Sequence, residues 1–254
     1  MTNPGNTSLP QRPTPGIDLV WGVVSTLLLA GWIYAQMGPM FALGGVIGIF
    51  VHEYGHVLAI NRAGMGPGKI HIIPFLGGAA SWKTPPDSEY TGALVALAGP
   101  AFGMVAALPF LIIAKVTGEM EWLKAAFFIS FLNLMNLLPA PPLDGSKVLG
   151  PVLARGHPLL ERGALLLIGG AVVVWALSRQ SWIFAGLVGI SMIGALSRGP
   201  MRLPSRPLAG REALSLLAFF TATVFLCLVA LQAIADGLDK DNPFVLLSSL
   251  VSFR

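Results

Sequence analysis

The stretch Phe50-Val51-His52-Glu53-Tyr54-Gly55-His56 lies inside an apolar segment that runs from about residue 40 to residue 63. Ionisable side chains are costly in such a segment, because one charge at the centre of a bilayer costs about 2.5 to 3.5 kcal/mol on insertion scales. Residues four apart lie on the same face of a helix, so His52 and His56 can each turn a ring nitrogen toward one metal ion. The stretch therefore predicts a metal site within a membrane helix.

The composition of the chain indicates a membrane protein in contact with a lipid bilayer. Of its 254 residues, 54% are hydrophobic and 11% are charged, whereas soluble domains carry about 25% charged residues. The net charge of +4 does not indicate a nucleic-acid partner, because basic residues in membrane proteins gather in cytoplasmic loops. The single cysteine, Cys227, excludes an intramolecular disulfide and is interpreted as a packing residue.

The order of apolar runs predicts an all-α polytopic membrane protein with six to seven transmembrane helices and a short β segment. Residues 1–16 are rich in proline and predict a disordered tail. We expect a transmembrane core over residues 17–155 and accessory helices over residues 156–254. The predicted spans are residues 17–37, 40–63, 90–115, 122–138, 163–178, 182–197 and 212–235, followed by a short interfacial piece at 243–253.

Residues 69–82 are too short to span the bilayer as a helix. Their isoleucines, an internal proline and a glycine pair fit an edge strand or a hairpin, so we expect a membrane-associated β segment here. Elsewhere, the pairs Gly44-Gly45 and Gly169-Gly170 are interpreted as points where two helices pack closely.

A proline-rich stretch, residues 136–145, interrupts the fourth predicted span. Three prolines in four residues exclude an ordinary helix, and irregular backbone at membrane depth requires burial in protein or a wet cavity. The stretch therefore leaves the membrane or lines a site. Asp144 is the only acidic residue between Glu121 and Glu161, which makes it a candidate partner of the histidines; the alternative is an Asp-Gly surface turn or a helix cap. Asn136 has the alternative role of bonding backbone groups freed near the prolines.

The distribution of basic residues predicts a cytoplasmic N-terminus. With that orientation the inside loops hold Arg12, Arg62, Lys69, Lys83, Lys147, Arg155, Arg162, Arg198, Arg202, Arg206 and Arg211, and the outside loops hold Lys115, Lys124, Arg179, Lys240 and Arg254. Eleven basic residues inside against five outside satisfy the positive-inside rule. The histidine stretch and Asp144 then lie toward the same side of the membrane, at similar depth.

Glu53 follows the first histidine directly, where the HExxH pattern of metalloproteases has its general base. Together with Asn136-x-x-Pro139-x-Pro141-x-Leu143-Asp144-Gly145, this motif resembles the site-2 protease family of intramembrane zinc metalloproteases over about residues 40–150. The resemblance implies a multi-pass protein of the prokaryotic plasma membrane that cleaves single-pass membrane proteins in or near their transmembrane segment.

The same resemblance implies the roles of individual residues. It implies one zinc ion per chain with His52, His56 and Asp144 as ligands, Glu53 as the catalytic carboxylate and Asn136 near the substrate or the transition state. The segment around residues 70–79 is similar to a family β segment that is proposed to pair with an unwound substrate. Family members often have asparagine three residues after the Gly-Pro of the third span, whereas this chain has Gly103.

Two other classes of function stay open. A membrane metal transporter also carries intramembrane histidines and carboxylates, but it is expected to have a second ligand-rich motif on a partner helix. A protease-like scaffold that binds membrane proteins without cleaving them is expected to have lost the glutamate or a ligand. Zinc content and cleavage, measured on the same purified protein, separate these classes from a protease.

Overall fold

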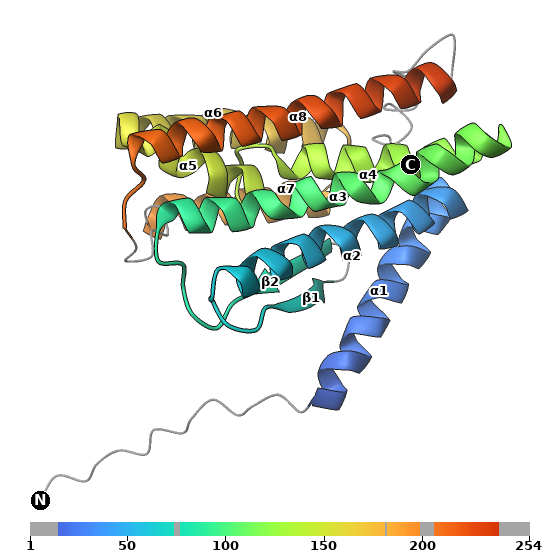
Figure 1. Ribbon diagram of the computed structural model, residues 1–254, viewed down its shortest axis with the longest axis horizontal. Helices are drawn as coiled ribbons and strands as arrows, with labels where there is room; N and C mark the ends of the chain where they lie inside the picture. Colours follow the sequence, from blue (N-terminus) through green and yellow to red (C-terminus); the bar gives the residue numbers. More distant parts are fainter. Residues whose placement is uncertain (1–14, 74–76, 181, 199–205, 239–254) are drawn as a thin grey trace, which may run out of the picture.

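The computed structural model describes residues 15–73, 77–180, 182–198 and 206–238. These residues form eight helices and a two-stranded sheet (Figure 1): α1 Pro15–Met37, α2 Pro39–Arg62, β1 Lys69–Ile73, β2 Gly77–Ser81, α3 Glu89–Thr117, α4 Glu121–Asn136, α5 Asp144–Gly156, α6 Pro158–Ser178, α7 Trp182–Arg198 and α8 Gly210–Leu238. The predicted interfacial piece at 243–253 lies outside the described residues. So does the predicted tail, except for its last two residues, which begin α1.

The helices fit the predicted class of all-α membrane protein. Four helices within the described ranges are long and apolar enough to cross a bilayer: Pro39–Arg62, Glu89–Thr117, Leu159–Ser178 and Gly210–Ile234. The predicted number of six to seven spans is larger than the number of described helices that are long and apolar enough to cross the bilayer. Helices α4 and α7 have 16 and 17 residues, or about 24 to 26 Å at 1.5 Å per residue, against a hydrocarbon core of about 30 Å.

The connection between α1 and α2 is a tight turn at Gly38 and Pro39. Gly38 has φ 95°, a backbone conformation that glycine adopts without steric cost. Pro39 is the first residue of α2, where its missing N–H removes no helical hydrogen bond. Helix α1 therefore turns directly into α2 and leaves the rest of the bundle at an angle (Figure 1).

Glycines let α2 approach its two neighbours at backbone distance. A Cβ on Gly44 would lie 2.6 Å from the backbone oxygen of Ala125 in α4, and a Cβ on Gly55 would lie 2.6 Å from that of Ala98 in α3. Both distances are shorter than real Cβ contacts. The expected close packing is thus confirmed at Gly44. In the pair Gly169-Gly170, close packing is found at Gly169, which lies against Met192. Gly170 has open space around it.

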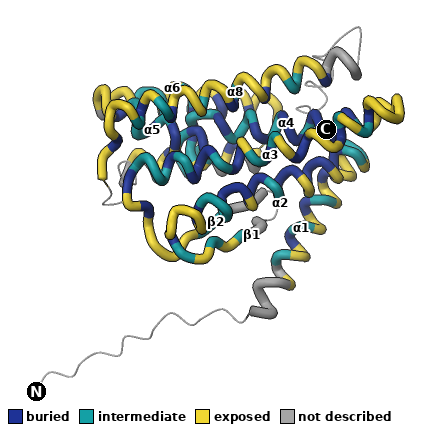
Figure 2. The backbone as a smooth tube through the Cα atoms, viewed as in Figure 1, coloured by how far each residue is buried: buried dark blue, intermediate teal, exposed yellow. Residues whose placement is uncertain are grey.

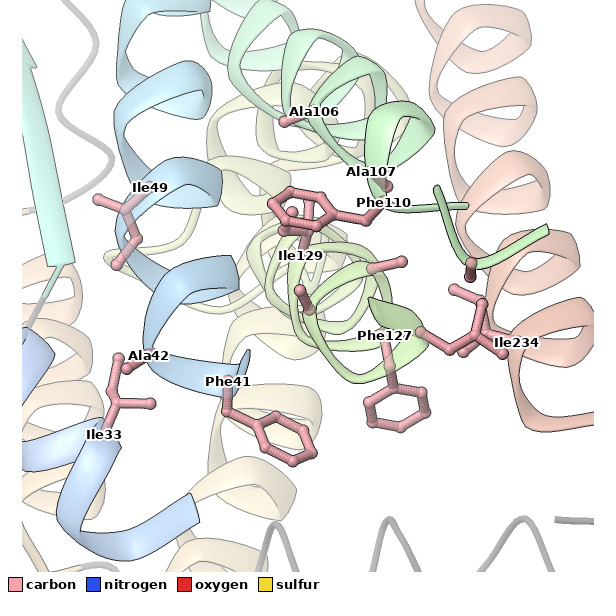
Figure 3. Close-up of a cluster of buried hydrophobic side chains, with 14 of the residues drawn as sticks. Ile33, Phe41, Ala42, Ile49, Ala106, Ala107, Phe110, Phe127, Ile129 and Ile234 are labelled. Carbon is pink, nitrogen blue, oxygen red and sulfur yellow. The ribbon is translucent and has the colours of Figure 1, made fainter. Parts of the chain in front are cut away.

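An apolar cluster fills the space between α2, α3 and α4, and residues of α1 and α8 pack into it (Figure 3). Ile129 of α4 is fully buried in it, beside Ala107 and Phe110 of α3 and Ile49 of α2. Between helices in a bilayer, close van der Waals packing of such side chains contributes to stability. Buried residues follow the inner faces of these three helices, while much of α6 and α8 is exposed (Figure 2). The three central helices are thus the fixed part of the fold.

The β segment predicted at 69–82 is an antiparallel hairpin. Lys69 pairs with Ser81 and Ile73 pairs with Gly77. The two strands lie beside α2, and β1 also contacts α1 (Figure 1). The hairpin is therefore held against the helix that carries both histidines.

The end of α4 differs from the prediction. The helix stops at Asn136, two residues before the predicted end of the span, because the following prolines cannot continue it. Residues 137–143 form a series of turns, closed by bonds such as that from the Leu143 N–H to the Ala140 carbonyl at 2.9 Å. Asp144 then opens α5, a helix that the sequence analysis did not predict.

The close contact between α2 and α4 predicts that two Gly→Ala substitutions change the stability of the protein in opposite directions. Gly44→Ala forces a methyl group against the Ala125 backbone, and overpacking of this kind costs about 1 to 3 kcal/mol. Gly31→Ala on α1 meets nothing within 4 Å, so it should stabilise the helix by about 0.5 to 1 kcal/mol. Thermal unfolding of the detergent-solubilised variants measures both changes. Equal effects at the two sites would contradict the packing argument.

Candidate metal centre

The two histidines and Asp144 meet inside the bundle. Residues His52 and His56 lie one turn apart on α2, while Asp144 comes from the first turn of α5. The Nε2 atoms of both histidines lie 3.1 Å from Asp144 Oδ2, and 3.2 Å from each other. All three residues are buried. The predicted convergence of an i, i+4 histidine pair with the aspartate of the proline-rich stretch is therefore present in the structure.

The hydrogen bond of His56 determines which of its ring nitrogens carries the proton. Its Nδ1 lies 2.7 Å from the backbone carbonyl of Val95 in α3. A carbonyl oxygen only accepts hydrogen bonds, so Nδ1 is the protonated nitrogen of the neutral ring. Nε2 then presents a lone pair to His52 and Asp144. This is the tautomer that metal-binding histidines adopt when their other nitrogen donates to a carbonyl.

The donor atoms fit a divalent metal ion. They belong to two imidazoles and one carboxylate, a ligand type common to catalytic zinc sites. Donor atoms on a tetrahedral zinc ion at 2.0 to 2.2 Å lie about 3.3 to 3.6 Å apart. The observed separations of 3.1 to 3.2 Å are slightly shorter, so a small outward movement of the side chains accommodates the ion. Among the described residues, His52, His56 and Asp144 are the group of this kind that could hold a metal.

Glu53 lies next to the first ligand and is 4% exposed. Its Oε2 atom has no hydrogen-bond partner among the described residues. An unpaired carboxylate oxygen in a dry interior is costly, so this atom needs a proton, a water molecule or a ligand. Its position matches the predicted general base, a group that must be free to take a proton.

The backbone of α3 closes one side of the centre at Gly99. A Cβ at this position would overlap the Nε2 atoms of His56 and His52. Sequence reasoning attributed no role to Gly99. The available signal was the Gly99-Pro100 pair within an apolar span, which marks a place where a helix backbone comes close to another group.

Lys147 holds the second oxygen of Asp144. Its Nζ atom donates to Asp144 Oδ1 at 2.9 Å, and its side chain is 55% exposed. Because Lys147 occupies Oδ1, the carboxylate presents Oδ2 alone to the two histidines. The sequence placed Lys147 in an inside loop and gave it no role; its position three residues after Asp144, one helical turn away, was the missed signal.

Two asparagines of α4 occupy different positions. Asn136, the predicted substrate contact, is half-buried at the end of the helix, and its Nδ2 donates to the Leu132 carbonyl at 3.1 Å. Its role beside a substrate stays a prediction. Asn133 is fully buried, and its Oδ1 lies 2.9 Å from Nδ1 of His52. Sequence reasoning missed Asn133, although a second amide in an apolar run was a usable signal.

Comparison with known proteins points to the same chemistry. No family model matches the chain. The chain is 28% identical over 120 residues to a zinc metalloprotease of Methanocaldococcus jannaschii. This alignment covers 45% of this chain and 34% of that protein. It is 27% identical over 209 residues to a Mycobacterium tuberculosis protein named as the zinc metalloprotease Rip3. This alignment covers 68% of this chain and 51% of that protein.

A third relative, from Synechocystis, is also named as a zinc metalloprotease. It is 31% identical to this chain over 140 residues, or 53% of this chain and 36% of that protein. The chain thus spans about a third to a half of the length of these relatives. All three relatives are named as zinc metalloproteases, and the His52, His56 and Asp144 cluster of this chain could hold a metal ion.

The contact at Gly99 predicts that a single methyl group strongly weakens metal binding. Gly99→Ala places its Cβ 2.3 Å from His56 Nε2 and 2.9 Å from His52 Nε2, so both rings must move. We therefore expect zinc affinity to fall by about 100-fold or more, beyond the usual effect of a disturbed ligand environment. Metal content after dialysis, measured by atomic emission, tests this.

The matched control is Gly170→Ala on α6, where a Cβ meets nothing within 4 Å. It should keep the zinc content of the wild type. If Gly99→Ala retains one zinc ion per folded chain, the metal does not lie between these two rings.

Proposed function

We propose that the chain is an intramembrane zinc metalloprotease of the site-2 type, which hydrolyses peptide bonds in or near the transmembrane segment of single-pass membrane proteins. The observation that carries this proposal is the unpaired Oε2 of Glu53 beside two histidines and an aspartate whose donor atoms converge within 3.2 Å. The relatives named as zinc metalloproteases support the reaction class. The membrane helices around the site support a substrate within the bilayer.

Each residue of the centre has its own role in the proposed hydrolysis. His52, His56 and Asp144 would hold one zinc ion per chain, which supplies an open position for water and polarises the scissile carbonyl. Glu53 takes a proton from the attacking water and returns it to the nitrogen of the leaving strand. Lys147 orients the Asp144 carboxylate from its other oxygen. Asn136 is the candidate donor to the developing oxyanion, because it lies where α4 ends and the proline-rich turns begin.

The hairpin supports a mode of substrate binding. A peptide bond in a helix is protected by its own hydrogen bonds, so the substrate must unwind before hydrolysis. A two-stranded sheet has free edges that can pair with an extended chain. The strands β1 and β2 lie beside α2, the helix that bears His52, Glu53 and His56. We propose that the unwound substrate adds to this sheet and is thereby aligned along the centre.

The orientation in the membrane is part of the proposal. The excess of basic residues in alternate loops favours a cytoplasmic N-terminus in a prokaryotic plasma membrane. With that orientation the centre lies toward the cytoplasmic side, from which water must reach Glu53. The lipid bilayer and a single-pass membrane protein are the partners that this arrangement requires.

The metal transporter is the weaker alternative. An ion pathway needs a series of sites so that the ion can enter and leave. Within the described ranges, one group of three or more metal-ligating side chains is present, and both of its histidines belong to one helix. The non-cleaving scaffold is disfavoured because Glu53 and the three candidate ligands are all in place.

The proposed mechanism predicts that Glu53→Gln separates metal binding from cleavage. The amide cannot accept the proton of water, so cleavage should fall by about 10²- to 10⁴-fold, while zinc content stays at the wild-type level because Glu53 is not a ligand. The assay uses purified full-length protein with a panel of tagged single-pass membrane proteins and follows the fragments by gel electrophoresis.

Glu121→Gln serves as the control, since Glu121 is exposed and pairs with Lys124. It should cleave like the wild type. Cleavage by Glu53→Gln at the wild-type rate would refute the role of Glu53. A zinc-loaded wild type that cuts no substrate of the panel, but moves zinc into sealed vesicles, would favour the transporter.

A further inference from the structure

Asn133 is a buried amide that the catalytic scheme does not use. It lies in α4, is fully buried and bonds with both ends of its side chain. Its Oδ1 lies 2.9 Å from His52 Nδ1, and its Nδ2 donates to the backbone carbonyl of Ile129 at 2.7 Å. It therefore connects the apolar cluster between the three central helices to the metal centre.

The Ile129 carbonyl determines the direction of this hydrogen-bond chain. A carbonyl oxygen only accepts, so the NH₂ group of the Asn133 amide must face it. The amide oxygen then faces His52, and His52 Nδ1 must carry the proton to complete the bond. In the neutral ring this leaves the lone pair on His52 Nε2, the atom that faces Asp144 and His56. The Ile129 carbonyl thus selects the tautomer of the candidate metal ligand His52, to which it is linked by two hydrogen bonds through Asn133.

The neighbouring helix fixes the amide in place. A Cβ on Gly103 of α3 would overlap the Asn133 carboxamide, so α3 reaches the amide at backbone distance only because residue 103 has no side chain. The amide is fully buried, and the Gly103 backbone of α3 lies against it. Gly103, where the resembled family often has asparagine, thus has a physical role: the absence of a side chain makes space for Asn133.

The two histidines are oriented by different means. A backbone carbonyl, that of Val95, accepts from His56, and no substitution of a side chain removes it. His52 depends on the Asn133 side chain. An unsatisfied Nδ1–H in this interior would favour the other tautomer or another ring rotation.

We propose that Asn133 is a positioning residue that fixes the ring orientation and the tautomer of His52 for metal binding. The inference rests on the metal-binding part of the proposed function and is independent of proteolysis. Residues that accept the second N–H of a metal-bound histidine typically contribute about 10- to 100-fold to metal affinity. We expect an effect of this size from Asn133.

The decisive experiment compares metal affinity in three variants of the full-length protein. Asn133→Leu keeps the number and branching of the side-chain heavy atoms and removes the acceptor; Asn133→Asp keeps an acceptor. Ser130→Ala is the control, because Ser130 is also fully buried on α4 and its hydroxyl has no partner among the described residues. Zn²⁺ affinity is measured by competition with a chelator. Co²⁺ is the spectroscopic probe, since its visible absorption reports the coordination geometry.

Asn133→Leu should bind Zn²⁺ about 10- to 100-fold more weakly and change the Co²⁺ spectrum, while Asn133→Asp should bind within about threefold of the wild type or more tightly. Ser130→Ala should match the wild type in both measurements. Wild-type affinity in Asn133→Leu overturns the inference. An equal loss in Asn133→Asp or in Ser130→Ala also overturns it, because the acceptor would then not be what matters.

Gly103→Ala gives an independent test that keeps every polar group. Its methyl group displaces the Asn133 amide, so Zn²⁺ affinity should fall about 10-fold or more, whereas Gly170→Ala should leave it unchanged. Size-exclusion profiles of the metal-free variants establish that each is folded. A wild type that binds Zn²⁺ but cleaves nothing would refute the proposed function and leave this inference intact, whereas unchanged affinity in Gly103→Ala would refute the inference alone.

Discussion

Three electron-pair donors face one another in an apolar interior. Nε2 of His52, Nε2 of His56 and Oδ2 of Asp144 lie 3.1 to 3.2 Å apart, and the ring nitrogens behind them are the ones that carry protons. Such atoms repel one another at this distance unless a positive charge lies between them. A bound cation relieves this repulsion, as does a proton on one of the ring nitrogens, and the surrounding helices hold the three atoms where a metal ion could bind.

That support depends on helices that approach each other at backbone distance. Gly44 and Gly55 bring α2 against α4 and α3, and Gly99 and Gly103 bring α3 against the histidines and Asn133. Within a bilayer, helix association gains little from excluding water, so close packing and interhelical hydrogen bonds must supply the stability. The same glycines that stabilise the bundle also set the distances within the centre. Stability and chemistry are therefore coupled in this fold.

The sequence predicted the cluster of candidate ligands better than it predicted the surroundings of that cluster. His52, Glu53 and His56 stand out because ionisable residues are rare in apolar runs, and Asp144 stands out within a proline-rich stretch. Span boundaries followed from hydrophobicity to within a few residues. Asn133 was missed because a neutral amide costs less in such a run than a charge does. Which of two asparagines on α4 turns inward depends on the rotation of the helix, and contacts with α2 and α3 determine that rotation.

Charge balance explains why an amide, and not a carboxylate, accepts from His52. Without a bound metal, the exposed Lys147 compensates the charge of Asp144, and Glu53 already adds a second carboxylate to the buried centre. A carboxylate at position 133 would fix the same tautomer and strengthen the pull on the metal, but it would leave an uncompensated charge at a fully buried position. Such a charge costs several kcal/mol in a dry interior. Asn133 supplies the direction of the hydrogen bond without that charge.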